Sequence, residues 1–405
     1  MSIMSIKRTA AALLAAALCA LSLAGCAKKK AESSSSDPLT QQSAFYTSQV
    51  DDPMDESMGS LEFTAKIKVG WSLGNTLDAT GGTGVASETS WGAPKTTEAL
   101  ILAVKEAGFN AVRVPTSWGR HMDEQYNIDE EWIARVNEVV DYAYNNDMYV
   151  ILNMHHEEWN YPYESNKEQG AQILTKAWTQ IAERFAKYGE RLIFEGMNEP
   201  RWVGTDQEWS GGNDEGRSVV NYFDRVFVDA VRATGGNNAN RFLMVCPYAA
   251  NSGEEALSAL VIPEDSADDR LIVSVHAYIP YSFALQKDGT AKWLAERPPC
   301  TREIDGLAEL LDRLFVSKGQ AVIIGEMGAM NRYYENDEGK TLPNEEYRAQ
   351  WAEYYTKTMK QHGIPCFVWD NNAFNSGETF GIFNRTTGEC KYPDYAAGLV
   401  KGAEQ

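Results

Sequence analysis

Residues 149–197 read YVILNMHHEEWNYPYESNKEQGAQILTKAWTQIAERFAKYGERLIFEGM and contain the pattern that decides the fold. Residues 149–154 and 192–197 are short, mostly apolar runs, which are typical of buried strands. Residues 168–188 lie between them with the apolar spacing of an amphipathic helix, and Gly189 follows, as glycine often does at the end of a helix. A strand, a helix and a second strand in this order predict two parallel strands joined by a crossover helix.

The same alternation continues along the chain in both directions. Eight strands are expected, at residues 67–73, 111–115, 149–154, 192–197, 242–247, 271–276, 321–325 and 366–369. Helices are expected at residues 97–107, 129–146, 168–188, 216–233, 301–318 and 344–362. This pattern predicts an α/β fold, a (β/α)8 TIM barrel that forms a single domain over residues 61–405. The alternative is a doubly wound open sheet, but the glycine-rich run at residues 81–84 does not open directly on a helical pattern.

The composition excludes some partners. The chain has 405 residues and a formal net charge of −20, and such an acidic surface repels phosphate backbones, so no nucleic-acid partner is expected. It also has 11 Trp, 19 Tyr and 14 Phe, enough for a core and for a site that binds flat, hydroxyl-rich rings.

The N-terminus has the features of a targeting segment. Lys7 and Arg8 precede an apolar run at residues 9–23 that is too short to span a bilayer. The run ends in Leu23-Ala24-Gly25-Cys26, which resembles the lipobox of bacterial lipoproteins. The resemblance implies that residues 1–25 are a signal peptide and that Cys26 carries lipid. The protein would then be anchored to a membrane in the bacterial cell envelope, outside the cytoplasm. An ordinary secretory signal is the alternative.

Residues 26–60 have few apolar residues and no sustained periodicity, which predicts a flexible tether between the lipid and the barrel. We expect the protein to be a monomer. Cys246 and Cys366 lie in strand-like apolar runs, which predicts buried free thiols, whereas the pairing of Cys300 with Cys390 is left open.

Two glutamates follow predicted strands at positions where barrel enzymes carry their catalytic groups. Glu199 follows the fourth strand and Glu326 follows the seventh. The carboxyl ends of the strands in a barrel meet at one mouth, so the two carboxylates should face each other there. A pair of carboxylates is what the cleavage of a glycosidic bond needs.

Other polar residues lie at the same strand ends. Arg113 interrupts the second strand and must pair with a carboxylate if it is buried, so it belongs either to a structural ion pair or to the site. The remaining candidates at strand ends are His155, Asn198, His276, Tyr278 and Trp369. Residues 155–158 read HHEE, but side chains alternate between faces along a strand and cannot all converge on one ion. We therefore expect no metal site in this run.

The first strand contains a pattern of a different enzyme class. Residues 70–74 match Gly-x-Ser-x-Gly, the nucleophile elbow of serine hydrolases. The elbow requires a helix directly after the serine, and a loop sequence follows Ser72 instead, which argues against a serine nucleophile.

The ordered set Arg113, His155, Asn198-Glu199-Pro200, His276-x-Tyr278, Glu326 and Trp369 resembles glycoside hydrolase family 5 over residues 61–400. Residues 73–78 and 88–97 are similar to the endoglucanase branch called subfamily 4, where Asn is more common at the position of Ala93. The resemblance implies a catalytic barrel that cleaves glycosides with retention by double displacement and needs no metal and no organic cofactor.

The resemblance also implies a role for each residue. Glu326 would be the nucleophile, kept ionised by Arg113 and Tyr278, and Glu199 would be the acid/base. The negative charge of Glu326 is expected to raise the pKa of Glu199, so that Glu199 starts protonated. Asn198 would bind the sugar 2-hydroxyl, His155 and His276 would position the reacting sugar, and Trp369 would stack beneath it.

The expected activity is that of an endo-β-1,4-glucanase acting on cellulose-type and mixed-linkage β-glucans, with xyloglucan as a further candidate. Aromatic residues in the predicted loops are expected to divide between the core and an open cleft: Trp118, Trp159, Tyr161, Trp202 and Trp209. A non-catalytic glycan-binding lipoprotein is the alternative outside enzymology, although it has no use for the two strand-end glutamates.

Overall fold

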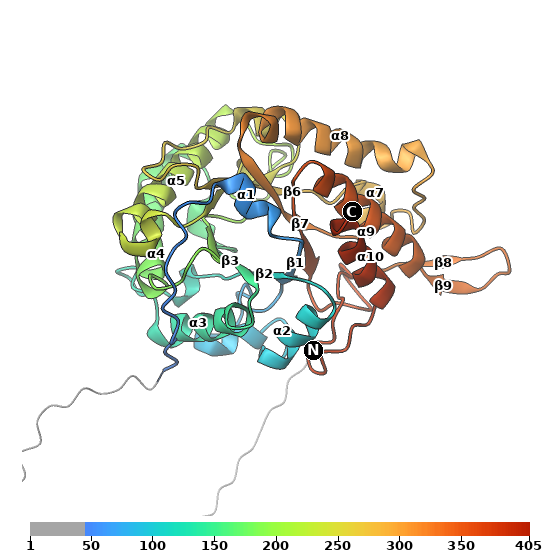
Figure 1. Ribbon diagram of the computed structural model, residues 1–405, viewed down its shortest axis with the longest axis horizontal. Coiled ribbons are helices and arrows are strands. Elements are labelled where there is room, and N and C mark those ends of the chain that lie inside the picture. Colours follow the sequence, from blue (N-terminus) through green and yellow to red (C-terminus); the bar gives the residue numbers. More distant parts are fainter. Residues whose placement is uncertain (1–44) are drawn as a thin grey trace, which may run out of the picture. The chain divides into compact units, whose positions relative to one another are not determined.

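The structure is a computed structural model that describes residues 45–405. The predicted signal peptide, Cys26 and the first part of the predicted tether lie outside the described residues. Eight parallel strands close into a barrel in the order β1-β10-β7-β6-β5-β4-β3-β2, with helices around them (Figure 1). The predicted (β/α)8 barrel is therefore confirmed.

The barrel strands lie within a few residues of their predicted positions. They are β1 (Val69–Leu73), β2 (Ala111–Val114), β3 (Tyr149–Asn153), β4 (Leu192–Glu195), β5 (Leu243–Val245), β6 (Leu271–His276), β7 (Ala321–Met327) and β10 (Cys366–Asp370). The strand β7 extends two residues further than expected and contains Glu326 instead of ending before it.

All six predicted helices are present: α2 (Glu98–Glu106), α3 (Glu130–Tyr144), α4 (Lys167–Arg184), α5 (Asp214–Ala233), α8 (Pro298–Leu314) and α9 (Glu345–Gln361). Side-chain oxygens of Thr97, Asp129 and Asn213 accept backbone N–H groups at the starts of α2, α3 and α5, which satisfies donors that a helix cannot pair itself.

Several elements were not predicted. They are the helices α1 (Ser60–Ala65), α6 (Glu254–Ala259), α7 (Tyr281–Ala284) and α10 (Pro393–Ala403), and a hairpin of β8 (Tyr333–Glu335) and β9 (Thr341–Pro343). The hairpin strands have three residues each and are mostly exposed, so they carry no hydrophobic alternation that a sequence pattern could show.

Alternate residues of each strand point into the barrel and fill it. The interior cluster consists of Ala111, Ile151, Ile193, Phe242, Met244, Ile272, Ala321, Ile323 and Phe367. Phe63 of α1 stacks on Phe242 with ring centroids 4.0 Å apart and closes the end of the barrel where the strands begin. Two residues further along β2, β3, β4 and β6, the inward positions are polar, which places a layer of polar side chains above an apolar plug: Arg113, Asn153, Glu195 and Ser274.

The segment before α1 corrects one boundary. The hydroxyl of Tyr46 donates to Asp141 of α3 at 2.6 Å, and Arg184 of α4 donates to the carbonyl of Tyr46 at 2.6 Å. Tyr144 of α3 donates to the carboxylate of Asp52 at 2.8 Å. The expected tether over residues 26–60 is therefore too long at its C-terminal end, because its backbone and side chains bind α3 and α4 from Tyr46 onward.

The prediction of buried free thiols in two strands is confirmed. Cys246 and Cys366 are buried free thiols, and Cys300 and Cys390 are also unpaired. Among residues 45–405, no helix has the length and apolar character needed to cross a membrane.

Asp224 of α5 is a buried carboxyl with one polar neighbour. Its Oδ1 accepts the backbone N–H of Cys246 at 3.4 Å, and its Oδ2 has no partner among the described residues. Burial raises the pKa of Asp224 well above its ordinary value. The folded state therefore retains a proton that the unfolded chain releases, and stability falls as the pH rises above about 3.9. We expect Asp224→Asn to be more stable than the wild type at pH 7 and equally stable below pH ~3.5. Urea unfolding at both pH values checks this, and a difference that does not grow with pH would contradict it.

Candidate active site

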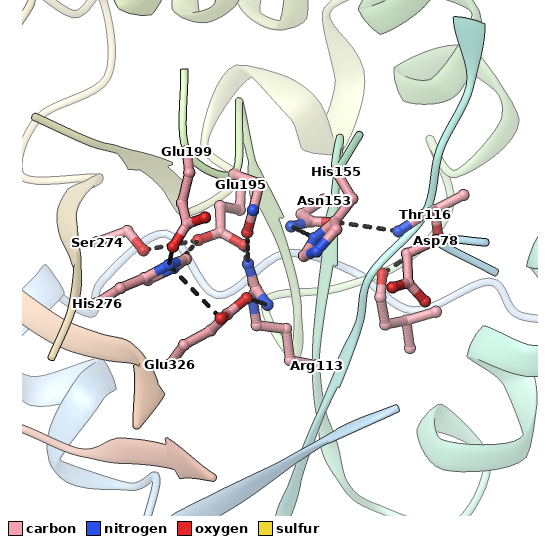
Figure 2. Close-up of polar contacts among 12 residues, drawn as sticks. Asp78, Arg113, Thr116, Asn153, His155, Glu195, Glu199, Ser274, His276 and Glu326 are labelled. Atoms are coloured by element: carbon pink, nitrogen blue, oxygen red, sulfur yellow. Dashed lines mark hydrogen bonds and ion pairs between the residues drawn. The ribbon is translucent and has the colours of Figure 1, made fainter. Parts of the chain in front are cut away.

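The two strand-end glutamates face each other at the mouth of the barrel. Glu199 follows β4 and Glu326 lies in β7, and carboxylate oxygens of the two lie within 4.8 Å of each other (Figure 2). In retaining glycosidases the two carboxyl groups are about 5–5.5 Å apart, whereas inverting enzymes hold them about 6.5–9.5 Å apart to leave room for a water. The separation is therefore that of a double displacement through a covalent intermediate.

A bulge in β7 points Glu326 into the site. The strands β6 and β7 pair Val275 with Ile324, and then His276 with Glu326, so Gly325 is an extra residue. A side chain on Gly325 would place its Cβ 2.6 Å from the hydroxyl of Ser274, so only glycine fits there. The extra residue lets Glu326 face the mouth, where simple alternation would have turned it outward.

Arg113 connects the site through three hydrogen bonds of 2.7 Å each. Its Nε donates to Glu195, its Nη1 to Glu326 and its Nη2 to the Oδ1 of Asn198. Arg113 is completely buried, and its ion pairs with Glu195 and Glu326 keep it charged there. Arg113 thus belongs both to a structural ion pair and to the site.

Glu195 is a residue that sequence reasoning missed. It is buried in β4, accepts hydrogen bonds from Arg113 at 2.7 Å and from Ser274 at 2.6 Å, and holds the side of Arg113 that faces away from Glu326. Although burial alone would raise it, Arg113 and His276 lower the pKa of Glu195 to about 2. A charge inside an apolar strand was the signal that singled out Arg113, and the run Leu-Ile-Phe-Glu at residues 192–195 carries the same signal.

Tyr278 and Arg113 both donate to the predicted nucleophile. The Tyr278 hydroxyl donates to Oε2 of Glu326 at 2.9 Å, and Arg113 donates to Oε1. Burial and the charge of Glu326 raise the pKa of Tyr278 well above its ordinary value, so the hydroxyl keeps its proton and remains a donor. These two donors stabilise negative charge on Glu326, as expected from the sequence.

The environment of Glu199 differs from the expected one. His276 Nδ1 lies 2.8 Å from Oε1 of Glu199, and Arg201 Nη1 lies 3.6 Å from Oε2. Although burial alone would raise it, the hydrogen bond and charge of His276, followed by the charge of Arg201, lower the pKa of Glu199. The expectation that the pKa of Glu199 is raised is therefore wrong. The two neighbouring cations lower it by more than the repulsion between the carboxylates raises it.

His155 and Trp369 form an aromatic surface beside the carboxylates. Their rings lie parallel, with centroids 5.6 Å apart, and Asn153 Nδ2 lies 3.1 Å from Nδ1 of His155. A side chain on Gly74 would place its Cβ 2.5 Å from the Trp369 ring, so this glycine allows β1 to approach the tryptophan. Ser72 is completely buried and its hydroxyl has no partner among the described residues, which argues against the serine-nucleophile alternative.

The run HHEE at residues 155–158 does not converge on one point. The carboxylate of Glu157 accepts the backbone N–H groups of Trp118 and Gly119, and Glu158 pairs with Arg120 at the surface. A different trio, Asp78, His155 and His156, has ligand-type atoms within 4.8 Å of one another. The oxygens of Asp78 already accept the backbone N–H groups of residues 75 and 76, so they hold the loop after β1.

An open cleft surrounds the two carboxylates. One part has a volume of about 820 Å³ and contains Glu199, Glu326, Trp369 and Trp209. A second part of about 620 Å³ shares Glu199 with the first.

The loop aromatics divide as expected. Trp159 and Tyr161 line the second part of the cleft, and Trp209 lines the first with 56% of its surface exposed. Trp118 is completely buried, and Trp202 packs against the core.

The chain is similar to characterised proteins over most of its length. A family model described as cellulase (glycosyl hydrolase family 5) matches residues 77–375. Endoglucanase 1 of Ruminococcus albus is 46% identical over 348 residues, which cover 85% of this chain and 81% of that protein. Endoglucanase B of Ruminococcus albus is 42% identical over 422 residues, which cover 99% of this chain and 98% of that protein.

Solved structures match the same region. A GH5-4 broad specificity endoglucanase from Ruminococcus champanellensis with bound cellotriose has a TM-score of 0.80 and 43% identity, covering 86% of this chain and 100% of that chain. A xyloglucan-specific endo-β-1,4-glucanase from a metagenomic library, in complex with cellotriose, has a TM-score of 0.77 and 40% identity, covering 84% and 97%. The matched family model spans most of the barrel, and the strand-end glutamates lie within it. This chain therefore belongs to glycosyl hydrolase family 5, the cellulase family, and is a glycoside hydrolase.

Proposed function

We propose that the protein is a retaining endo-β-1,4-glucanase that cleaves β-glucan chains in the middle. The observation that carries this function is the pair Glu199 and Glu326, with oxygens within 4.8 Å of each other in an open cleft. The endoglucanases among its relatives and the cellotriose bound by solved neighbours support a β-1,4-glucan backbone as the substrate.

Each carboxylate has its own role in the proposed mechanism. Glu326 attacks the anomeric carbon, and its charge is held by Arg113 and Tyr278 until the bond forms. Glu199 delivers a proton to the departing oxygen and later takes one from the attacking water. Asn198 is fixed by Arg113 through its Oδ1, which leaves its amide Nδ2 as a donor for the sugar 2-hydroxyl. Trp369 and His155 present ring faces on which a pyranose can pack.

Mixed-linkage glucan, carboxymethylcellulose and xyloglucan are the proposed substrates. Both parts of the cleft are open to solvent and lined by aromatic rings, so a long or branched chain can lie across Glu199 in either direction. We expect the viscosity of these polymers to fall well before reducing ends accumulate, and the first product to retain the β-configuration. Viscometry and proton NMR of fresh digests test both points. Much faster cleavage of mannan, or cellobiose as the only early product, would contradict the substrate assignment, and an inverted product would contradict the mechanism.

We also propose that the protein is a lipoprotein anchored to the cell envelope through Cys26. The support is the sequence Leu23-Ala24-Gly25-Cys26 after an apolar run. Enzymatic activity should fractionate with membranes, and Cys26→Ser should release active enzyme or leave it unprocessed. Native protein found entirely in the soluble medium would contradict the anchor. The matched control is Ser22→Ala, which lies outside this tetrapeptide. This variant should fractionate as the wild type does.

A further inference from the structure

Two basic side chains face the carboxyl group of the acid/base Glu199, and both favour its ionised form. His276 contacts one of its oxygens at 2.8 Å and Arg201 lies 3.6 Å from the other. The first chemical step nevertheless requires Glu199 to deliver a proton to the glycosidic oxygen. A neighbouring side chain that holds a proton and can release it to Glu199 would meet this requirement.

His276 is the neighbour that is built to hold a proton. It is 7% exposed, and carboxylates that follow or belong to two other strands face its ring. Its Nδ1 lies 2.8 Å from Glu199 and 3.7 Å from Glu326, and its Nε2 lies 3.9 Å from Glu195. Although burial alone would lower it, these three carboxylates raise the pKa of His276 to about 9, so the ring is an imidazolium at neutral pH.

The other groups around His276 do not compete for this role. The charged and titratable side chains that surround this network are Arg113 of β2, His155 and His156 after β3, Arg201 after β4, Tyr278 after β6 and Glu378 after β10. Burial lowers the pKa of His156 to about 4, so its ring is neutral at pH 7. The guanidinium of an arginine does not release its proton in proteins. Tyr278 already donates to Glu326, and burial lowers the pKa of His155 well below its usual range, so that ring is neutral.

We propose that His276 stores at rest the proton that Glu199 donates, so that the working acid is the Glu199–His276 pair; this inference rests on the proposed glycosidase function. The N–H bond at Nδ1 breaks while an O–H bond forms at Oε1 of Glu199, which leaves a neutral imidazole and a neutral carboxyl. Glu199 then gives the proton to the glycosidic oxygen, which departs with the electrons of the broken C–O bond as Glu326 bonds to the anomeric carbon.

The second half of the reaction restores the proton. Glu199 takes a proton from water while the water oxygen bonds to the anomeric carbon and displaces Glu326. That proton then returns to Nδ1 of His276. Glu326 regains its negative charge in this step, 3.7 Å from Nδ1, which again favours the imidazolium.

Substrate binding supplies the reason for the first transfer. The resting pair consists of two opposite charges at the floor of a cleft that solvent water can enter. A sugar bound over Glu199 displaces that water, and desolvation favours two neutral groups over an ion pair. His276 keeps its second N–H on Nε2, which faces Glu195 and has no hydrogen-bond partner among the described residues.

The pH dependence of kcat/KM tests the proposal with two matched variants. His276 and Arg201 both face the carboxylate of Glu199. His276→Gln removes a cation that can release a proton, whereas Arg201→Met removes a cation that cannot. In the wild type the alkaline limb reports loss of the proton shared by the pair. We expect His276→Gln to move that limb to lower pH by at least about one unit, because Glu199 must then hold the proton alone. Arg201→Met should leave the limb in place or move it to higher pH.

Two outcomes would overturn the proposal. One is an alkaline limb in His276→Gln that coincides with that of the wild type. The other is an equal downward shift in both variants, which would show that only the loss of a positive charge matters. Circular dichroism and thermal unfolding establish that the variants are folded before their profiles are compared.

A measurement on the wild-type protein avoids the folding question. The chain has five histidines, so nitrogen-15 NMR of histidine-labelled protein can follow His276, assigned by its absence in His276→Gln. We expect an imidazolium at pH 7 in the free enzyme and a lower pKa for His276 once Glu326 carries a 2-deoxy-2-fluoro-cellobiosyl group. A neutral ring at pH 7 in the free enzyme overturns the proposal. Wild-type cleavage of β-glucan with retention is measured in parallel: its absence refutes the proposed function, whereas retention with an unmoved limb refutes only the role of His276.

Discussion

Replacing Glu326 by glutamine is expected to lower kcat on β-glucan by about 10⁴-fold or more, because an amide cannot take the place of the carboxylate in forming the glycosyl ester. The amide retains the size of the side chain: its oxygen can accept the hydrogen bond of Arg113 in the place of Oε1, and its Nε2, in the place of Oε2, can donate to the hydroxyl oxygen of Tyr278. Binding of cello-oligosaccharides should therefore survive the loss of turnover. Initial rates and isothermal titration calorimetry with cellotriose measure the two quantities separately.

Covalent trapping identifies the attacked residue directly. A 2-deoxy-2-fluoro-cellobioside with a good leaving group should inactivate the wild type, and peptide mapping should find the sugar on Glu326. Glu378→Gln is the matched control, because this glutamate lines the same cleft whereas Arg113 donates to Glu195, Glu326 and Asn198, and its loss of turnover should be far smaller. Turnover by Glu326→Gln within tenfold of the wild type would refute the assignment of the nucleophile.

Replacing Glu195 by glutamine should cost about 3–5 kcal/mol of unfolding free energy, because it leaves part of the charge of a buried Arg113 unpaired. Neither Glu195 nor Arg113 is exposed to solvent, so water cannot replace the lost interaction. Arg113 would no longer be held on the side opposite Glu326, so kcat should fall as well. Urea unfolding and initial rates on mixed-linkage glucan measure the two effects.

The pH dependence of stability gives a second measurement on the same variant. The pKa of Glu195 is lowered to about 2 in the folded state, so its contribution is present above the unfolded value of about 4.3 and is lost as the pH falls towards 2. The difference in unfolding free energy between the wild type and Glu195→Gln should therefore shrink as the pH falls from about 4.3 to about 2.

Glu88→Gln is the matched control, since Glu88 forms a comparable buried ion pair with Arg135 on the flank of the barrel. It should lose stability without losing activity. Equal stability of Glu195→Gln and the wild type at pH 7 would contradict the account of the network.

The sequence by itself was enough to predict the barrel and nearly all of the polar residues of the candidate active site. Each strand is a run of apolar residues, and each helix has its own periodicity and cap, so these elements depend on short-range patterns that a single chain displays. Position at the end of a strand was enough to select Glu199, because all such ends meet at one mouth of a barrel.

The tertiary structure alone decided how those residues interact. Glu326 faces the mouth only because β6 and β7 shift register at Gly325, and a register shift depends on the pairing of two strands that lie far apart in the sequence. Glu195 belongs to the site only because Arg113, 82 residues earlier, reaches it across the barrel. The pKa of Glu199 is lowered, against the expectation from the charge of Glu326 alone, because the pKa depends on the sum of all charges around the group. That sum exists only once His276 and Arg201 are placed within 4 Å of Glu199, which is why sequence patterns identify catalytic residues and folded geometry sets their charge states.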